Sequence, residues 1–122
     1  MPEAQVPWRL DLSELCELYG EGGLRTLLAV ALDELDCQRA LFDTAFQQGQ
    51  LLQAAEALHR LTGTAAFFAR DERSLDPLYR AEQALRLADA GLAKRTLANA
   101  RAALAALRAT FLDELARHGG TK

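Results

Sequence analysis

Apolar residues recur at helical spacing along most of the chain. Side chains three and four positions apart lie on one face of a helix, so apolar residues at these intervals form a stripe that packs against a core. Three long stretches carry such a stripe: Leu24, Leu27, Leu28, Ala31, Leu35, Phe42 and Phe46; Leu51, Ala54, Leu58, Leu61, Ala65 and Phe68; Leu97, Ala100, Leu104, Leu107, Phe111 and Leu115. The pattern predicts amphipathic helices around a common core.

Residues that start and stop helices divide the sequence into five predicted helices. They cover residues 11–19, 24 to about 48, about 50 to 69, 76 to 91, and a fifth stretch that ends at Gly119-Gly120. Asp11 is expected to accept hydrogen bonds from the first free amides. Gly20, Gly22 and Gly23 separate the first two helices, and Gly91 is expected to end the fourth.

Short connections make consecutive helices antiparallel neighbours. The expected fold class is therefore all-α, an antiparallel four-helix bundle with a short additional N-terminal helix. Residues 1–9 are expected to be an N-terminal arm, either loose or packed as a strap. Residues 10–118 form the predicted bundle domain, and residues 119–122 a C-terminal tail.

Composition supports one helical domain. The chain has 122 residues, 50% of them hydrophobic and 25% charged, which is typical of a globular domain and not of a disordered segment. It contains no isoleucine, and its only valines are Val6 and Val30, so the β-branched residues that favour strands are nearly absent.

Charge and hydropathy exclude two classes of partner. A net charge of −3 gives no general attraction to nucleic acid, and no apolar run approaches the roughly 20 residues of a membrane span. The N-terminus lacks the basic and apolar segments of a secretory signal, so we expect a cytoplasmic protein without membrane insertion. Cys16 and Cys37 are expected to be reduced and buried.

Few residues carry reactive chemistry. Neither Ser13 nor Ser74 lies in the context of a nucleophilic serine, and no glycine-rich loop could hold a phosphate. Glu56 and His59 match the Glu-x-x-His element of dinuclear metal bundles, which also needs a second such element and two further glutamates. His118 has a leucine in place of that glutamate, so no metal site is predicted. His118 is instead interpreted as a last-turn cation favoured by the helix dipole.

His59 points away from the predicted core. At about 100° per residue it lies roughly 130° from the centre of the apolar stripe of its helix. The same side carries small and apolar residues, which are unusual on a solvated face. They are Leu52, Ala55, Glu56, Gly63, Ala66 and Phe67. This pattern predicts a partner-docking patch around His59, with Phe68 pointing into the core.

The stretch LHRLTGTA, residues 58–65, resembles the core motif of histidine-containing phosphotransfer (HPt) domains. That motif places a histidine, any residue, a leucine, usually a lysine and then a glycine on a bundle helix. Five helices in about 120 residues also fit, so the resemblance covers residues 10 to about 118. Two positions depart from the motif, because Thr62 replaces the usual lysine and Ala69 a usual glycine.

The resemblance implies a phosphorelay intermediate that is not an autonomous kinase. His59 would accept a phosphoryl group from a receiver-domain aspartate of a hybrid sensor kinase and pass it to a response regulator. Gly63 would leave space for that group. Magnesium would come with the receiver partner, so the chain, a monomer, would need no cofactor of its own.

Two alternatives remain open. The first is a degenerate module that binds a receiver or another helical partner without phosphotransfer, which Thr62 favours. The second is a metal-binding bundle.

Overall fold

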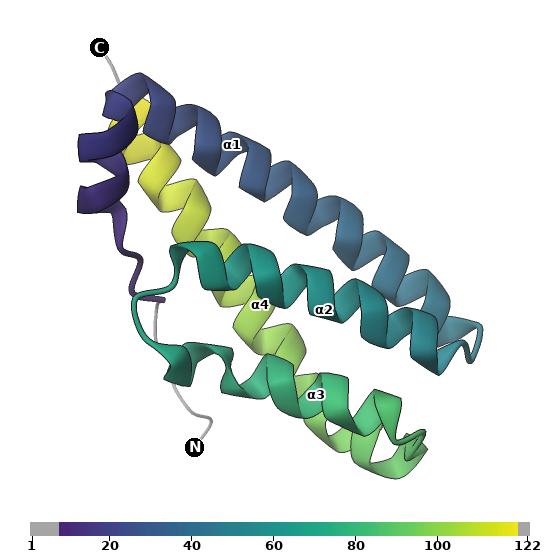
Figure 1. Cartoon of the computed structure of the whole chain (residues 1–122). Coiled ribbons are helices and arrows are strands. Elements are labelled where there is room, and N and C mark those ends of the chain that lie inside the picture. Colours follow the sequence, from purple (N-terminus) through teal and green to yellow (C-terminus); the bar gives the residue numbers. More distant parts are fainter. Residues whose placement is uncertain (1–7, 120–122) are drawn as a thin grey trace.

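The structure, a computed structural model, describes residues 8–119, and the predicted arm and tail lie largely outside this part. The elements are α1 (Leu12–Gln47), α2 (Leu51–Phe68), the 3-10 helix η1 (Glu72–Leu75), α3 (Asp76–Arg86) and α4 (Ala90–Gly119), shown in Figure 1. The described residues contain no β-strand beyond one isolated bridge, so the prediction of an all-α chain is confirmed for them.

α1 bends at Gly20, which has φ 76° and ψ 172° within an otherwise helical element. This φ lies in the left-handed region that glycine adopts without a steric penalty. The predicted separation of two helices is therefore correct at Gly20, but helical backbone resumes at Glu21 and not at Leu24. We call residues 12–19 the N-terminal segment of α1; it is the dark purple piece that turns away from the rest of the helix in Figure 1.

Asp11 precedes α1 as predicted, but its side chain makes no capping hydrogen bond. Its backbone N–H instead donates to the carbonyl of Phe68 at 2.9 Å, and Leu10 forms a bridge with Ala69. The Trp8 indole is buried and donates from Nε1 to the carbonyl of Ala103 at 2.9 Å. Residues 8–11 are thus a packed strap that ties the end of α2 to α4.

The junction between α3 and α4 differs from the prediction. Gly91 does not end a helix but lies in the first turn of α4. The chain reverses at Ala88, which has φ 56°, and the Asp89 carboxylate accepts from the backbone N–H of Leu92 at 3.0 Å. Because Asp89 satisfies a free amide at the helix start, α4 begins there and includes the glycine.

The connection before α3 is also more ordered than a solvated loop. The Asp71 carboxylate accepts from the backbone N–H groups of Arg73 at 2.8 Å and Ser74 at 3.3 Å. This cap starts η1, whose last residue, Leu75, is buried. α3 then begins at Asp76-Pro77 as predicted.

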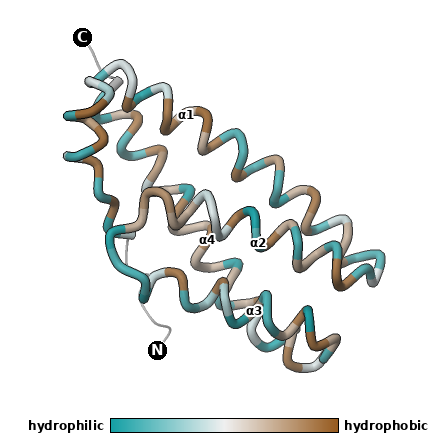
Figure 2. Tube along the Cα trace, in the orientation of Figure 1, coloured by the Kyte–Doolittle hydropathy of each residue, from teal (hydrophilic) through white to brown (hydrophobic). Residues whose placement is uncertain are grey.

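The core lies between the helices. α1 packs against α2 and α4, and α3 packs against α2 and α4. Figure 2 shows hydrophobic and hydrophilic positions alternating along every helix. Burial of each large apolar side chain stabilises the fold by about 1.5–3 kcal/mol relative to exposure. The largest fully buried residues are Phe42, Phe111, Leu24, Leu28, Leu58, Leu61, Leu78, Leu85 and Leu107.

Both cysteines are free, but the prediction that they are buried is wrong. Cys37 is exposed because it lies on the outward side of α1, beside the apolar stripe that includes Leu35. Cys16 is only half-buried. Within residues 8–119, no helix has the length and apolar character that crossing a membrane requires.

Candidate functional site

His59 lies on the outer face of α2. Its side chain is 70% exposed, whereas the adjacent Leu58 and the nearby Leu61 are fully buried. The helical arithmetic that placed His59 opposite the core is therefore correct. An exposed imidazole is accessible to a macromolecular partner without any rearrangement of the core.

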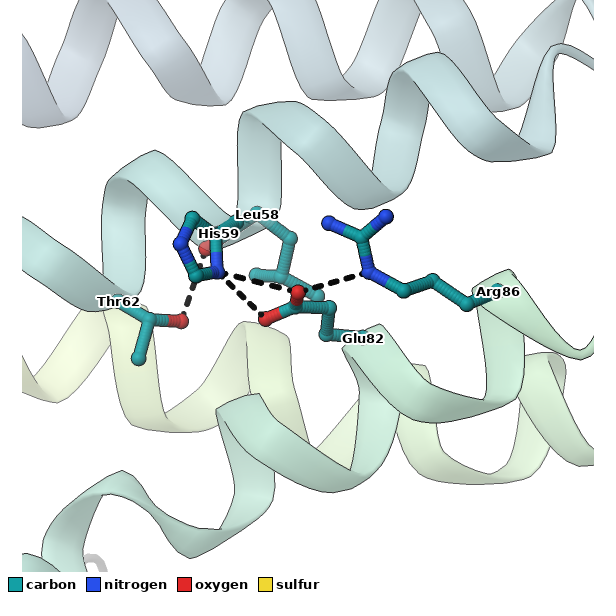
Figure 3. A network of polar contacts seen from close by, with 5 residues as sticks. All are labelled: Leu58, His59, Thr62, Glu82 and Arg86. Atoms are coloured by element: carbon teal, nitrogen blue, oxygen red, sulfur yellow. Dashed lines mark hydrogen bonds and ion pairs between the residues drawn. The ribbon is translucent and has the colours of Figure 1, made fainter.

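A carboxylate from the neighbouring helix holds one nitrogen of this ring. His59 Nδ1 lies 3.1 Å from Oε2 and 3.3 Å from Oε1 of Glu82 on α3, as Figure 3 shows. A carboxylate only accepts hydrogen bonds, so a neutral ring facing it carries its proton on Nδ1. The lone pair is then on Nε2, the nitrogen that points away from Glu82 in Figure 3.

Arg86 completes this arrangement one turn further along α3. Its Nε donates to Glu82 Oε2 at 2.9 Å, while the Glu82 side chain is only 13% exposed. The guanidinium therefore makes a charge-assisted hydrogen bond to a carboxylate that is largely removed from water. His59, Glu82 and Arg86 thus form one network across α2 and α3.

Sequence reasoning missed Glu82 and Arg86. Their spacing of four residues on a predicted helix is a recognisable ion-pair pattern. That pattern does not reveal that the pair faces His59, because the alignment of α3 against α2 is a tertiary property. The sequence therefore showed the Glu82–Arg86 pair, but only the packing of α3 on α2 shows that the pair faces His59.

Thr62, the position of the usual lysine, does not face solvent. It is 3% exposed, and its hydroxyl donates to the carbonyl of Leu58 at 2.8 Å (Figure 3). The cation that the structure places in the histidine network is Arg86.

Five of the residues that were predicted to share the outer face with His59 are exposed, and the placement of Ala55 on that face is wrong. Ala55 is fully buried. The reason is that α2 packs against both α1 and α3, so its buried face is wider than one stripe and includes Ala55 as well as Thr62. The exposed members are Leu52, Glu56, Gly63, Ala66 and Phe67.

Gly63 lies next to open space. A Cβ added at this position would meet no atom within 4 Å outside its own helix backbone. Close helix packing therefore does not require a glycine here. Because Gly63 lies one turn beyond His59, α2 carries no side chain at this position next to the imidazole.

The surface continues onto α3. A cavity of about 510 Å³ beside the imidazole is lined by His59, Tyr79, Glu82, Gln83, Arg86 and Leu87. Tyr79 and Leu87 are exposed large apolar side chains. We call the exposed Leu52, Phe67, Tyr79 and Leu87 the apolar rim of the His59 site. The α3 half of this rim was not predicted, because candidates were sought only on the helix of His59.

The described residues offer no assembled metal centre. Among them, no group of three or more His, Cys, Asp or Glu side chains is arranged to hold a metal ion. Glu56 is exposed on the surface of α2, and the second histidine, His118, contacts Glu21 and Glu114 instead of the His59 network.

Comparisons of the chain with protein-family models, with curated proteins and with solved structures each gave no match. The geometry of the His59 site therefore carries the functional argument by itself.

Proposed function

We propose that the chain is an HPt module, an antiparallel four-helix bundle that carries phosphoryl groups between receiver domains on His59. The observation that carries this proposal is the combination of an exposed imidazole with a carboxylate on Nδ1 only. This arrangement leaves Nε2 as the free nucleophile. A neutral imidazole nitrogen with a free lone pair is itself a nucleophile.

The transfer step uses the two ring nitrogens differently. The Nε2 lone pair attacks phosphorus of the receiver's aspartyl phosphate, a P–N bond forms, and the P–O bond to the aspartate breaks. The electron pair of the broken bond leaves with the aspartate carboxylate. The ring keeps its proton on Nδ1 and becomes cationic, and the Glu82 carboxylate at 3.1 Å compensates this charge. Return of the phosphoryl group to a second receiver reverses these steps.

The surrounding residues supply access and docking. Gly63 keeps the approach to Nε2 open, and the apolar rim with Glu56 and Ala66 provides the contact surface for the receiver. Hybrid sensor kinases and response regulators carry such receivers, whose acidic pocket brings the magnesium. The module acts in the cytoplasm as a monomer, without a cofactor of its own and without kinase activity.

The position of Thr62 favours a second candidate, a module that binds a receiver without chemistry. Thr62 is buried and bonded to Leu58, so it provides no positive charge for a transferred phosphoryl group. In the relay proposal that role falls to Arg86, whose Nε already contacts Glu82. The two candidates share a docking surface and differ only in whether His59 is phosphorylated.

Incubation with a panel of phosphorylated receivers and magnesium distinguishes them. We expect a label on the native chain that is lost in acid and survives alkali, as a phosphoramidate does. His59→Gln should abolish the label, and His118→Gln, the matched control, should retain it. Labelling of His59→Gln, or no labelling of the native chain by any receiver that binds it, contradicts the relay proposal.

A further inference from the structure

The second histidine of the chain lies between two carboxylates. His118 Nδ1 is 2.9 Å from Glu21 Oε1, and His118 Nε2 is 3.3 Å from Glu114 Oε1. Glu21 directly follows the bend at Gly20, and Glu114 lies one turn before His118 on α4. Ninety-seven positions separate Glu21 from His118, so this contact joins the bend of α1 to the last turn of α4.

The geometry specifies the protonation state of the ring. Ionised carboxylates only accept hydrogen bonds, and a neutral imidazole has a single N–H to donate. The contact with Glu21 is a hydrogen bond through Nδ1, whereas the contact with Glu114 is an ion pair, which exists only when the ring is charged. The arrangement around His118 therefore fits an imidazolium, in contrast to His59, where one nitrogen is free.

A pocket that is open to solvent lies beside this contact. A cavity of about 540 Å³ is lined by Leu12, Ser13, Cys16, Glu17, Leu24 and His118. Most of these residues belong to the N-terminal segment of α1. His118, whose side chain is 21% exposed, thus covers one side of the space between that segment and the helices behind it.

We propose that Glu21, His118 and Glu114 form a proton-dependent clasp, which holds the part of α1 directly after the bend at Gly20 against the end of α4 when His118 is charged and loosens when His118 is neutral. A neutral ring loses the charge attraction to both carboxylates and turns the lone pair of one nitrogen toward a carboxylate. Histidine is the side chain whose unperturbed change of charge falls between pH 5 and 8.

The other charged groups around the ring set the limits of this response. Cys16 donates to Glu21 Oε2 at 3.3 Å, Glu17 lines the same cavity, and Arg117 contacts Glu114 Oε2 at 3.4 Å. The hydrogen bond from His118, the bond from Cys16 and the nearby Arg25 lower the pKa of Glu21. Because the pKa of Glu21 is lowered, its contribution to stability is fully present above the ordinary pKa of a glutamate. It is lost only as the pH falls through the lowered pKa.

The clasp is therefore closed in mildly acidic solution and loosens as the pH rises through the titration of His118. This inference does not depend on the proposed phosphotransfer, because none of its residues belongs to the His59 network.

The test follows the His118 ring and the backbone amides of residues 20–24 by NMR in one pH titration of the whole chain. We expect the amides to shift with the same midpoint as the ring. Their hydrogen exchange, corrected for its intrinsic pH dependence, should rise roughly three- to tenfold from pH 6 to pH 8, as expected for loss of one partly exposed charge-assisted bond.

Two substitutions fix the clasp in each state. His118→Gln should give fast exchange at both pH values, and His118→Arg, which stays charged, should give slow exchange at both. His59→Gln is the matched control and should retain the native pH response. If the amides of residues 20–24 do not follow the ring, or if His118→Gln keeps the native response, the clasp is refuted. A circular dichroism spectrum of each variant separates these results from global unfolding.

Discussion

The two histidines of this chain occupy opposite chemical situations. His59 is 70% exposed and contacts the carboxylate of one residue through Nδ1, which leaves Nε2 free. His118 is 21% exposed and contacts a different carboxylate through each nitrogen. The difference shows that the number of partners on the ring, more than its presence on a helix surface, decides whether an imidazole is available for chemistry.

Their carboxylate partners differ in the same way. Glu82 is 13% exposed and is shared between His59 and Arg86, so its charge stays beside the imidazole. Glu21 is 64% exposed and is shared between His118 and Cys16. In the proposed function Glu82 compensates the positive charge of the phosphorylated His59 ring. In the proposed clasp Glu21 and His118 hold two helix segments together.

Removal of the negative charge of Glu82 should have the largest effect, and it should change the rate of phosphotransfer to His59. Glu82→Gln keeps the shape of the side chain but cannot compensate a cationic ring. Loss of a charge-assisted contact of about 1.5–3 kcal/mol should slow phosphotransfer to His59 roughly ten- to a hundredfold. Glu114→Gln is the matched control, because it removes a carboxylate from the other histidine. Equal rates for the native chain and Glu82→Gln in a transfer assay would remove Glu82 from the account.

The burial of Thr62 gives the next largest expected change. Thr62→Lys would place a charged group at a position that is 3% exposed and would remove the bond to the Leu58 carbonyl. We expect the free energy of unfolding to fall by about 2–3 kcal/mol. Thr62→Val, which loses only the hydroxyl, should cost about 1 kcal/mol. A chemical denaturation series measures both, and a lysine variant as stable as the native chain would show that position 62 reaches solvent.

The apolar rim should affect binding without affecting folding. Leu52→Ala and Phe67→Ala remove exposed side chains, so each should weaken receiver binding by about 1–2 kcal/mol while the melting temperature stays nearly constant. Val30→Ala, an exposed apolar position on α1, is the matched control and should leave affinity unchanged. Calorimetric titration measures the affinities. A large loss of melting temperature for Leu52→Ala or Phe67→Ala would place these residues in the core.

Gly63 should produce the smallest change in stability. Because an added Cβ meets no neighbouring atom, Gly63→Ala should raise the free energy of unfolding by up to about 1 kcal/mol through helix propensity. Gly63→Gln should also fold well but should slow transfer, because a long side chain fills the space next to His59. Gly22→Gln, a substitution in α1 away from that space, serves as the control for transfer. An unchanged rate in Gly63→Gln would show that the open surface has no role in access.

The sequence predicted the helical class, the start of α3 and the outward position of His59, because these follow from local periodicity and capping. The prediction placed the end of the fourth helix at Gly91. It did not recognise that Asp89 caps α4 and that Ala88 takes a left-handed conformation. The burial of Ala55, which was expected to be exposed, and the burial of Thr62 have a different origin. Both follow from α2 having two packed neighbours, and single-helix periodicity does not contain that information.

The same limit explains why half of the candidate site was missed. His59 could be identified from its own helix, whereas Glu82 and Arg86 belong to α3 and gain their role only through packing. His118 was interpreted as a cation at a helix end. Its contact with Glu21 spans nearly the whole chain, so no local pattern predicts it.

The central claim is that Nε2 of His59 is the atom that receives a phosphoryl group. Long-range proton–nitrogen NMR on chain labelled with ¹⁵N, recorded before and after incubation with a phosphorylated receiver and magnesium, tests it at the level of the atom. The account predicts a neutral His59 ring with its proton on Nδ1 beforehand, and a new phosphorus coupling on Nε2 of His59 afterwards, with His118 unchanged. Phosphate on Nδ1 of His59 or on His118, or an unmodified His59 with a receiver that binds, would contradict it.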